Sequence, residues 1–203
     1  MGFFDRNREE LVRRGYSPDR LPPGQYFTDR FPVLHVGEVP ETDLRSWQLR
    51  LFGAVAEERR FTWDELRALP EATVDCDIHC VTKWTKLDTR WSGVRFRDVM
   101  ALVEVDPAAD TVIAHAEADY TANVPLAALL DDDVLLAWDF DGVPLAPDHG
   151  GPLRLLVPKR YFWKSAKWLR GLEWRVGDEP GFWERNGYHN DALPFLEQRY
   201  WGD

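Results

Sequence analysis

The sequence is poor in cysteine and contains no long apolar run. Only 2 of its 203 residues are cysteine, Cys76 and Cys80, which are too few and too close together for the disulfide framework of a small secreted domain. No window approaches the roughly 18 apolar residues of a membrane-spanning helix, and the first residues lack the apolar stretch of a signal peptide. We therefore expect no membrane partner and a location in the reducing cytoplasm.

Positive charge and nucleotide-binding motifs are also scarce. The chain carries 25 Lys and Arg against 35 Asp and Glu, a formal net charge of -10 at pH 7. An acidic chain of this kind is not typical of nucleic-acid binders, so no nucleic-acid partner is expected. The pair Gly150-Gly151 belongs neither to a G-x-G-x-x-G motif nor to a P-loop, so no motif indicates a bound nucleotide.

The cations that are present gather in one segment, residues 154–175. Seven of them lie there with a single acid, Glu173: Arg154, Lys159, Arg160, Lys164, Lys167, Arg170 and Arg175. A concentrated positive segment in an acidic chain indicates either a bound anion or a solvated basic face. The spacing of the cations does not choose between the two.

The hydrophobic pattern predicts a mixture of strands and short helices. Strands are expected at residues 47–51, 74–80, 111–116, 134–140, 143–145, 153–157 and 172–176. Short helices are expected at 62–69, where Thr62 and Glu65 match a capping box, and at 96–103, 125–130 and 163–169. Residues 84–91 are expected to form a loop, and 31–37 a buried loop. Because strands and helices do not alternate regularly, we expect an α+β fold.

The strand at 74–80 carries the most reactive side chain of the sequence. Apolar side chains and Cys76 alternate along it, and Cys80 is placed where the strand meets a loop, beside Lys83 and Trp84. A nearby cation favours the thiolate, the form that binds soft metals. Three interpretations stay open: cysteines of a core strand, a zinc site formed by Cys76, His79 and Cys80, and one thiolate that holds a cofactor metal. The zinc site is disfavoured, because His79 should point away from both cysteines.

Three segments in order resemble a known family. They are DIHCVTKW from Asp77, DHGGPLRLLVP from Asp148 and KSAKWL from Lys164. Together they resemble the molybdopterin-binding domain of the sulfite oxidase family, which includes the bacterial methionine sulfoxide reductase catalytic subunit. The resemblance implies the mixed-sheet α+β fold of that family over residues 30–176. Residues 1–29 are then an N-terminal arm. Residues 177–203 carry six aromatic side chains and are expected to pack back onto the domain.

The resemblance also implies a cofactor and its contacts. The cofactor is Mo-molybdopterin, with one protein cysteine as a further thiolate ligand of the metal, and Cys80 matches that cysteine. The other implied cofactor contacts are Leu34, His35, His115, His149, Arg154, Ser165, Ala166 and Lys167. Arg154 and Lys167 are suited to a phosphate, and Gly150-Gly151 can offer backbone donors. For His115, a hydrogen-bonded core side chain is an equal alternative.

The implied activity is a two-electron oxygen-atom transfer on a small-molecule substrate, either a sulfite-like oxyanion or a sulfoxide. Cys80, Lys83, Trp84 and Trp138 are the expected catalytic residues. Lys83 would attract an anion, although plain core packing is an alternative for both tryptophans. Sulfite oxidases have Tyr at the position of Trp138 and Arg at that of Lys164, which leaves the substrate open. A non-catalytic molybdopterin carrier or sensor is the alternative function. We expect a monomer with a separate electron-transfer partner.

Overall fold

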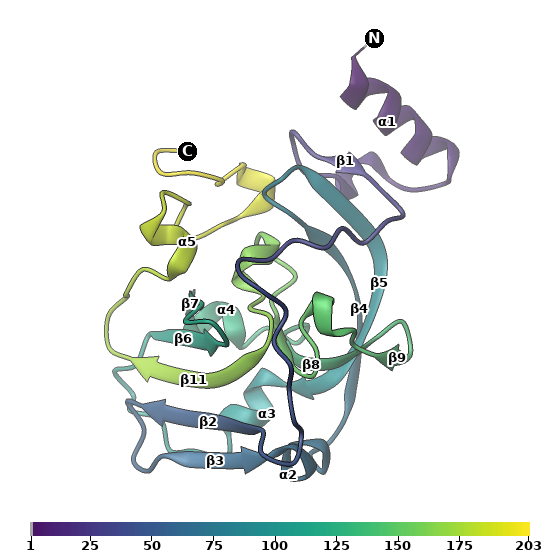
Figure 1. Cartoon of the computed structure of the whole chain (residues 1–203). Helices are drawn as coiled ribbons and strands as arrows, with labels where there is room; N and C mark the ends of the chain where they lie inside the picture. Colours follow the sequence, from purple (N-terminus) through teal and green to yellow (C-terminus); the bar gives the residue numbers. More distant parts are fainter. Residues whose placement is uncertain (1) are drawn as a thin grey trace.

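The computed structural model describes residues 2–203, with residues 3–5 described by their backbone alone, and contains two mixed β-sheets (Figure 1). The first sheet has the order β1-β5-β8-β10, with β4 paired to β5 and β9 to β8. Its strands are β1 (Tyr26–Phe27), β4 (Ala72–His79), β5 (Trp84–Arg95), β8 (Leu135–Phe140), β9 (Val143–Pro144) and β10 (Arg154–Leu156). The second sheet has the order β3-β2-β11-β6-β7. Its strands are β2 (Gln48–Gly53), β3 (Arg59–Thr62), β6 (Thr111–Ala116), β7 (Thr121–Pro125) and β11 (Leu169–Arg175).

The helices are short and connect the strands. The α-helices are α1 (Phe3–Arg13), α2 (Trp63–Arg67), α3 (Phe96–Met100), α4 (Leu126–Leu129) and α5 (Phe182–Arg185). The 3-10 helices are η1 (Pro18–Arg20), η2 (Pro147–His149), η3 (Phe162–Lys164) and η4 (Pro194–Leu196). At α2 the predicted capping box is confirmed, because Thr62 and Glu65 each accept a hydrogen bond from the other's backbone amide. None of the helices in residues 2–203 has the length and apolar composition to cross a membrane.

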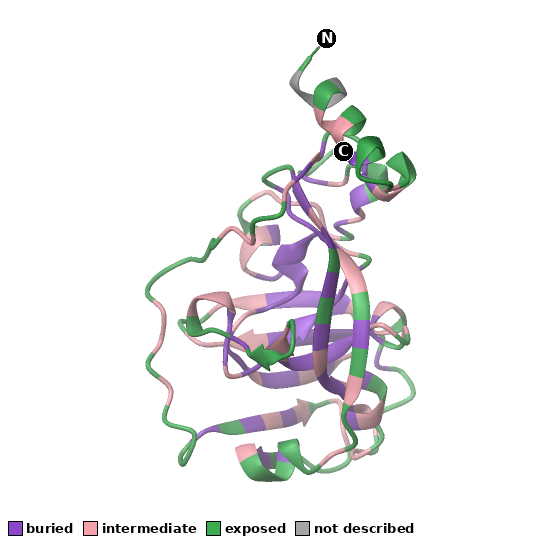
Figure 2. Cartoon of the chain, turned by 90° about the vertical axis from the view of Figure 1, so that its right-hand side faces the viewer, coloured by how far each residue is buried: buried purple, intermediate pink, exposed green. Residues whose placement is uncertain are grey.

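The main hydrophobic core lies between the two sheets. Leu49 and Leu51 of β2 and Leu172 and Trp174 of β11 face it from the second sheet, and Leu136 of β8 faces it from the first. Leu49 and Leu51 alternate with more exposed neighbours along β2, and this kind of alternation is visible on strands in Figure 2, whereas both neighbours of Leu136 are buried. The 154–175 segment ends in β11, the central strand of the second sheet, and this strand packs against the core.

The largest error of the sequence prediction is at residues 84–91, which form the first part of strand β5 and not a loop. Leu87, Thr89 and Trp91 are buried and alternate with exposed Asp88 and Arg90. The buried threonine conceals the period of two, because a hydrophobicity pattern treats it as a polar position. The strand pairs with β4 along most of its length, with β1 at Trp84 and Thr85, and with β8 from Trp91 to Arg95.

Strands β3 and β7 were also not predicted, and the helix expected at 163–169 is only the turn η3 followed by β11. Both strands are short edge strands of the second sheet. Their sequences carry a proline or several arginines, residues that are depleted in strand patterns but tolerated at sheet edges. Edge position therefore overrode local propensity in these two places.

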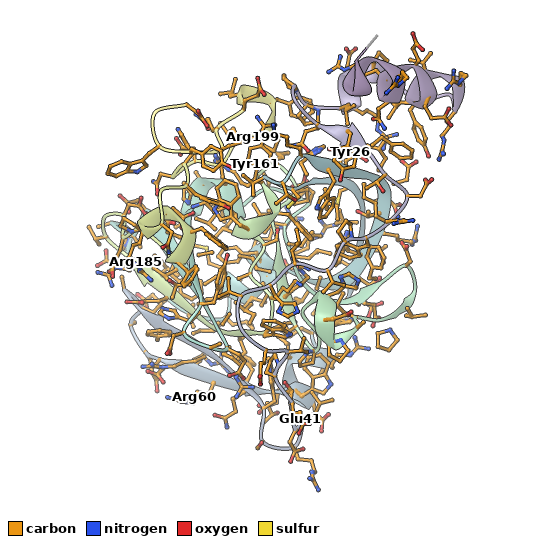
Figure 3. All side chains as sticks on the ribbon, turned by 45° about the horizontal axis from the view of Figure 1, so that its top comes forward. Tyr26, Glu41, Arg60, Tyr161, Arg185 and Arg199 are labelled. Atoms are coloured by element: carbon orange, nitrogen blue, oxygen red, sulfur yellow. The ribbon has the colours of Figure 1, made fainter. Side chains whose placement is uncertain are left out.

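The two ends of the chain pack against the same end of the first sheet. Strand β1 pairs in parallel with the start of β5. Near the other terminus, the Arg199 guanidinium donates to the carbonyl of Pro23 at 3.0 Å and lies over the Tyr161 ring. Figure 3 shows Tyr26, Tyr161 and Arg199 at this end of the molecule. The arm predicted at 1–29 begins at Met1, which lies outside the described residues.

Candidate functional site

Cys80 lies in the tight turn that joins β4 to β5. Its backbone amide donates to the Trp84 carbonyl at 2.9 Å, and the Lys83 amide donates to the Cys80 carbonyl at 3.0 Å. Lys83 closes the turn with a left-handed φ of 77°. The buried Gln25 side chain also donates to the Cys80 carbonyl at 3.0 Å. The position of the cysteine is therefore fixed by strand pairing and by the N-terminal segment.

The Cys80 thiol is 8% exposed and has one side-chain partner, the Thr82 hydroxyl, which donates to Sγ at 3.1 Å. Burial raises the pKa of this thiol, and the hydrogen bonds from Thr82 and the charge of Lys167 oppose the rise. The cation that acts on the thiol is thus Lys167 and not the adjacent Lys83. A buried thiol of this kind becomes a thiolate when a metal ion replaces its proton.

Cys80 opens onto a cavity of about 350 Å³. The side chains that line it come from the 31–36 loop, the Cys80 turn, the 154–168 segment and the C-terminal tail. They are Phe31, Pro32, Leu34, His35, Val36, Cys80, Val81, Thr82, Trp84, Tyr120, Arg154, Phe162, Trp163, Ser165, Ala166, Lys167, Trp168, Trp183 and Tyr188. The structure thus brings together eight of the predicted site residues: Leu34, His35, Cys80, Trp84, Arg154, Ser165, Ala166 and Lys167.

We name the side formed by Arg154, Ser165, Ala166 and Lys167 the cation wall. Arg154 is buried on β10 and donates to the carbonyls of His149 and Ser165, each at 2.7 Å. Burial lowers its pKa to about 9. Its Nε has no hydrogen-bond partner. A buried guanidinium with a free donor is a site for an acceptor that the protein itself does not supply.

Lys167 is the second cation of this wall. Its ammonium donates to the Asp148 carbonyl at 2.5 Å, while the Ser165 hydroxyl accepts from the Val157 amide at 2.9 Å. Burial, and next to it the charge of Arg154, lower the pKa of Lys167 to about 7. Within residues 2–203, neither Lys167 nor Arg154 forms an ion pair with a carboxylate. Two enclosed cations without a counter-ion suit an anionic ligand such as a phosphate.

Two further buried ring nitrogens without a hydrogen-bond partner lie close to the cavity. Trp84 Nε1 and His149 Nδ1 are both buried without a hydrogen-bond partner. Trp84 lines the cavity, and the His149 ring stacks on Phe31, which also lines it, with 3.8 Å between the ring centroids. With Arg154 Nε they form a set of unpaired polar groups that a large polar heterocycle can satisfy. The site residues therefore fit a buried, anionic, polar cofactor.

The loop that carries Leu34 and His35 is not buried, contrary to the prediction. Leu34 is 50% exposed, and His35 donates from Nδ1 to the Gly37 carbonyl at 2.9 Å while its ring meets Trp168 edge-on. The loop runs across the front of the molecule in Figure 1, so one side faces the cavity and the other faces solvent. Its apolar residues reflect this position and not a core.

Four predicted site residues, Lys83, Trp138, His115 and His149, lie outside the cavity lining. Lys83 has an exposed side chain. Trp138 belongs to the core between the sheets and donates from Nε1 to Glu71 at 3.2 Å. His115 donates from Nε2 to Glu173 at 2.8 Å across the β6–β11 pair. The backbone of each strand or turn determines the direction of these side chains, and this direction cannot be read from the local sequence.

The glycines Gly150 and Gly151 have a different use from the one predicted. Their amides donate within their own turn, to the carbonyls of Pro147 and Ala146. A Cβ on Gly150 would lie 2.9 Å from the Lys167 side chain, and one on Gly151 would lie 2.1 Å from the Leu145 carbonyl. These glycines permit close packing behind the cation wall and do not offer free backbone donors.

Sequence reasoning missed the aromatic part of the site. Tyr120, Phe162, Trp163 and Trp168 line the cavity from the domain, and Trp183 and Tyr188 line it from the C-terminal tail. The high aromatic content of the tail was the one feature of the sequence that could have indicated these cavity-lining residues. The zinc alternative has no support in residues 2–203, where His, Cys, Asp and Glu side chains nowhere gather in a group of three or more that could hold a metal ion.

Comparison with known proteins agrees with this geometry. Residues 36–183 match the family described as oxidoreductase molybdopterin binding domain. The chain is 44% identical over 193 residues to the uncharacterized oxidoreductase YuiH of Bacillus subtilis, covering 95% of this chain and 98% of that protein. It is 32% identical to the putative protein-methionine-sulfoxide reductase subunit YedZ1 of Azospira oryzae, covering 86% of this chain and 68% of that protein.

More distant relatives and a solved structure extend the comparison. Mitochondrial sulfite oxidase of Drosophila melanogaster is 27% identical, and the match covers 88% of this chain and 34% of that protein. The crystal structure of the sulfane dehydrogenase SoxCD from Paracoccus pantotrophus has the same fold, with a TM-score of 0.65 at 21% identity, over 81% of this chain and 46% of that one. The predicted mixed-sheet α+β fold is confirmed. The chain belongs to the molybdopterin-binding oxidoreductase domain family of the sulfite oxidases, and its cofactor is Mo-molybdopterin.

Proposed function

We propose that this protein is a molybdenum enzyme that transfers an oxygen atom, with two electrons, to or from a small substrate, and that Cys80 is the protein ligand of the metal. The supporting observation is the Cys80 turn itself. It places a buried thiol on the cavity that also holds two cations without counter-ions, Arg154 and Lys167. A soft thiolate suits the metal, and the two cations suit the phosphate end of the cofactor.

The chain's own residues have separate tasks in this proposal. Arg154 and Lys167 hold the phosphate, while Arg154 Nε and the ring nitrogens of Trp84 and His149 donate to the polar ring system. The Thr82 hydroxyl donates to Sγ of Cys80 and holds it in one orientation. The bound cofactor supplies the redox chemistry. The aromatic side chains around the cavity exclude water from it.

The substrate is a small molecule that gains or loses one oxygen atom. In the reductive direction it takes up two electrons and two protons and releases its oxygen as water, and in the oxidative direction water supplies the oxygen. The electrons come from or go to a separate protein partner in this proposal. The relative from Azospira oryzae is described as a reductase subunit, which supports such a division of labour.

The test is metal and pterin content. The protein is produced in a host that makes molybdenum cofactor, and molybdenum is measured by mass spectrometry and pterin by fluorescence after acid oxidation. We expect near-stoichiometric amounts, and loss of molybdenum or of turnover in Cys80→Ser. Cys76→Ser is the matched control, because Cys76 lies four residues earlier on the same strand and is absent from the cavity lining. A fully loaded and fully active Cys80→Ser protein would contradict the proposal.

A second outcome separates the enzyme from a carrier. An enzyme retains its cofactor through gel filtration. Its metal is reduced by a chemical reductant and oxidised again by an oxygen-donating substrate. A protein that loads with cofactor, releases it readily and turns over neither sulfoxides nor oxyanions would be a carrier or sensor module.

A further inference from the structure

The cavity has a second side, which η3 and the C-terminal tail supply. We name it the tail wall and define it as Trp163, Trp183 and Tyr188. The Tyr188 ring stacks on Trp183 with 4.7 Å between centroids and meets Trp163 edge-on at 5.0 Å. Tyr188 lies beyond residues 36–183, the part that matches the family. Trp163 and Trp183 lie within the matched residues, so Tyr188 is the member of this wall that the family match does not cover.

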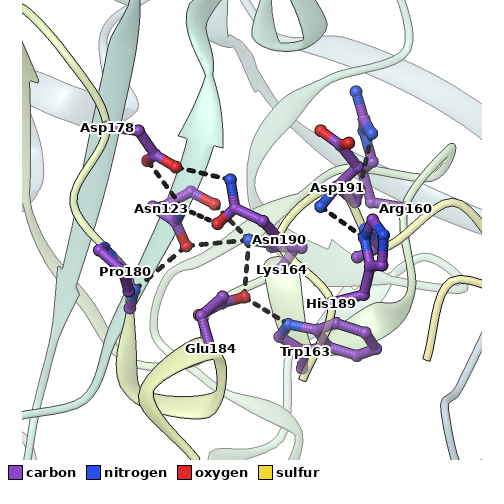
Figure 4. Close-up of polar contacts among 12 residues, drawn as sticks. Asn123, Arg160, Trp163, Lys164, Asp178, Pro180, Glu184, His189, Asn190 and Asp191 are labelled. Atoms are coloured by element: carbon purple, nitrogen blue, oxygen red, sulfur yellow. Dashed lines mark hydrogen bonds and ion pairs between the residues drawn. The ribbon is translucent and has the colours of Figure 1, made fainter. Parts of the chain in front are cut away.

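A buried ion pair fastens the tail wall to the domain. Lys164 of η3 and Glu184 of α5 have side chains that are 1% and 3% exposed, and their Nζ and Oε1 atoms are 2.6 Å apart. The same carboxylate oxygen accepts from Trp163 Nε1 at 2.7 Å. Lys164 also donates to the carbonyl and side-chain oxygens of Asn123, at 2.7 and 2.9 Å. Figure 4 shows this network around the Lys164 ammonium.

The network extends along the tail. The Asn123 side-chain amide donates to Asp178 at 2.8 Å and to Asn190 at 2.7 Å, and the Gly181 amide donates to Asn123 Oδ1 at 3.2 Å. Residues on both sides of Trp183 and Tyr188 are therefore held by one buried side chain. The hydrogen bonds of Asn123 therefore position Trp183 and Tyr188 before any ligand enters.

The ion pair also removes a charge from the cavity. Lys164 is fully compensated by Glu184 and absent from the cavity lining, and the cations of the lining, Arg154 and Lys167, both belong to the cation wall. The tail wall offers instead three aromatic side chains, one of which, Tyr188, has a hydroxyl for which the structure of residues 2–203 records no hydrogen-bond partner. A surface of this kind desolvates an oxyanion without compensation and accepts an apolar body with one polar atom.

We propose that the tail wall selects a neutral substrate, an apolar molecule with one hydrogen-bond-accepting oxygen such as a sulfoxide, and that the Tyr188 hydroxyl donates to that oxygen. The inference rests on the proposed function and names its substrate class. Trp183 and Trp163 contact the apolar body of the substrate. Lys164 and Glu184 are positioning residues, which act by holding the wall in place.

The test compares Tyr188→Phe with the wild-type holoenzyme. Dissociation constants are measured without reductant, by quenching of tryptophan fluorescence, for a neutral probe (methyl phenyl sulfoxide) and an anionic one (sulfite). KM and kcat for the sulfoxide follow with a chemical reductant. Loss of one hydrogen bond should weaken sulfoxide binding and raise its KM about 3- to 10-fold, with a smaller change in kcat, and should leave sulfite binding unchanged.

Tyr200→Phe is the matched control, because Tyr200 meets Tyr188 edge-on, is 51% exposed and is absent from the cavity lining. It should bind both probes as the wild type does. Equal effects of the two variants, or tighter binding of sulfite than of the sulfoxide by the wild type, would overturn the inference. A loaded holoenzyme that turns over only oxyanions contradicts this inference alone. One that turns over neither class contradicts the proposed function.

Discussion

Two buried lysines near the cavity, Lys164 and Lys167, differ in whether a carboxylate neutralises their charge. Lys164 and Lys167 are three residues apart, and both are enclosed by the fold. Lys164 has a carboxylate 2.6 Å away, a complete set of hydrogen bonds and no access to the cavity. Lys167 has no carboxylate partner among the described residues and faces the cavity. A buried cation with its counter-ion is part of the scaffold, whereas one without it is a site for a ligand.

The largest effect is expected when the scaffold pair is broken. Glu184→Gln leaves the Lys164 ammonium buried without a counter-ion, and such a change typically lowers the free energy of unfolding by about 3–5 kcal/mol. Urea denaturation measures this loss. The double variant Lys164→Met, Glu184→Leu should recover much of it, because no isolated charge is left in the interior. A double variant as unstable as Glu184→Gln would mean that the hydrogen bonds to Trp163 and Asn123, and not the charges, carry the stability.

A smaller, pH-dependent effect is expected at the other lysine. The pKa of Lys167 is lowered to about 7 in the cofactor-free protein, and a bound anion would favour the charged form and raise it. Affinity for inorganic pyrophosphate should therefore be high below pH 7 and fall by up to about tenfold per pH unit above it. Calorimetry in two buffers of different ionisation heat should register proton uptake on binding. In Lys167→Met the affinity should be low and nearly independent of pH, and an unchanged pH profile would remove Lys167 from the anion site.

The smallest effect belongs to an ion pair of the same length on the surface. Arg13 and Glu10 of α1 are also 2.6 Å apart, but their side chains are 67% and 40% exposed. Water and salt screen such a pair, so Glu10→Gln should leave the urea midpoint within experimental error. A shift comparable to that of Glu184→Gln would show that burial is not what separates the two pairs.

Sequence alone singled out candidate residues that the structure brings to one cavity, but it did not predict their contacts. Cys80 could be placed at a strand end from the period of two, and Arg154 and Lys167 stood out as cations in an acidic chain. The partner of Lys164 could not be found in this way, because Glu184 lies 20 positions further along, in a tail without a strand or helix pattern. Pairing across such distances depends on how the sheets and the tail pack together.

The predicted site residues whose side chains point away from the cavity also have a common cause. Strand β8 is buried on both faces: Trp138 lies on the face of the core between the sheets, and its neighbour Ala137 lies on the face of a second hydrophobic cluster that contains Cys80. A shift of one residue in register exchanges the two faces. Lys83 is adjacent to Cys80 in sequence, yet its left-handed backbone turns the side chain outward. Proximity along the chain therefore says little about proximity to the thiol.

Both chain ends contribute to the surroundings of Cys80. Gln25, from the N-terminal segment, binds its carbonyl, while Trp183 and Tyr188 close the cavity from the other terminus, and Arg199 ties the two ends together through Pro23. A chain folds from its N-terminus as it is synthesised, so the cavity is complete only after residues 183–199 have left the ribosome. Insertion of the cofactor is accordingly a late step of biogenesis.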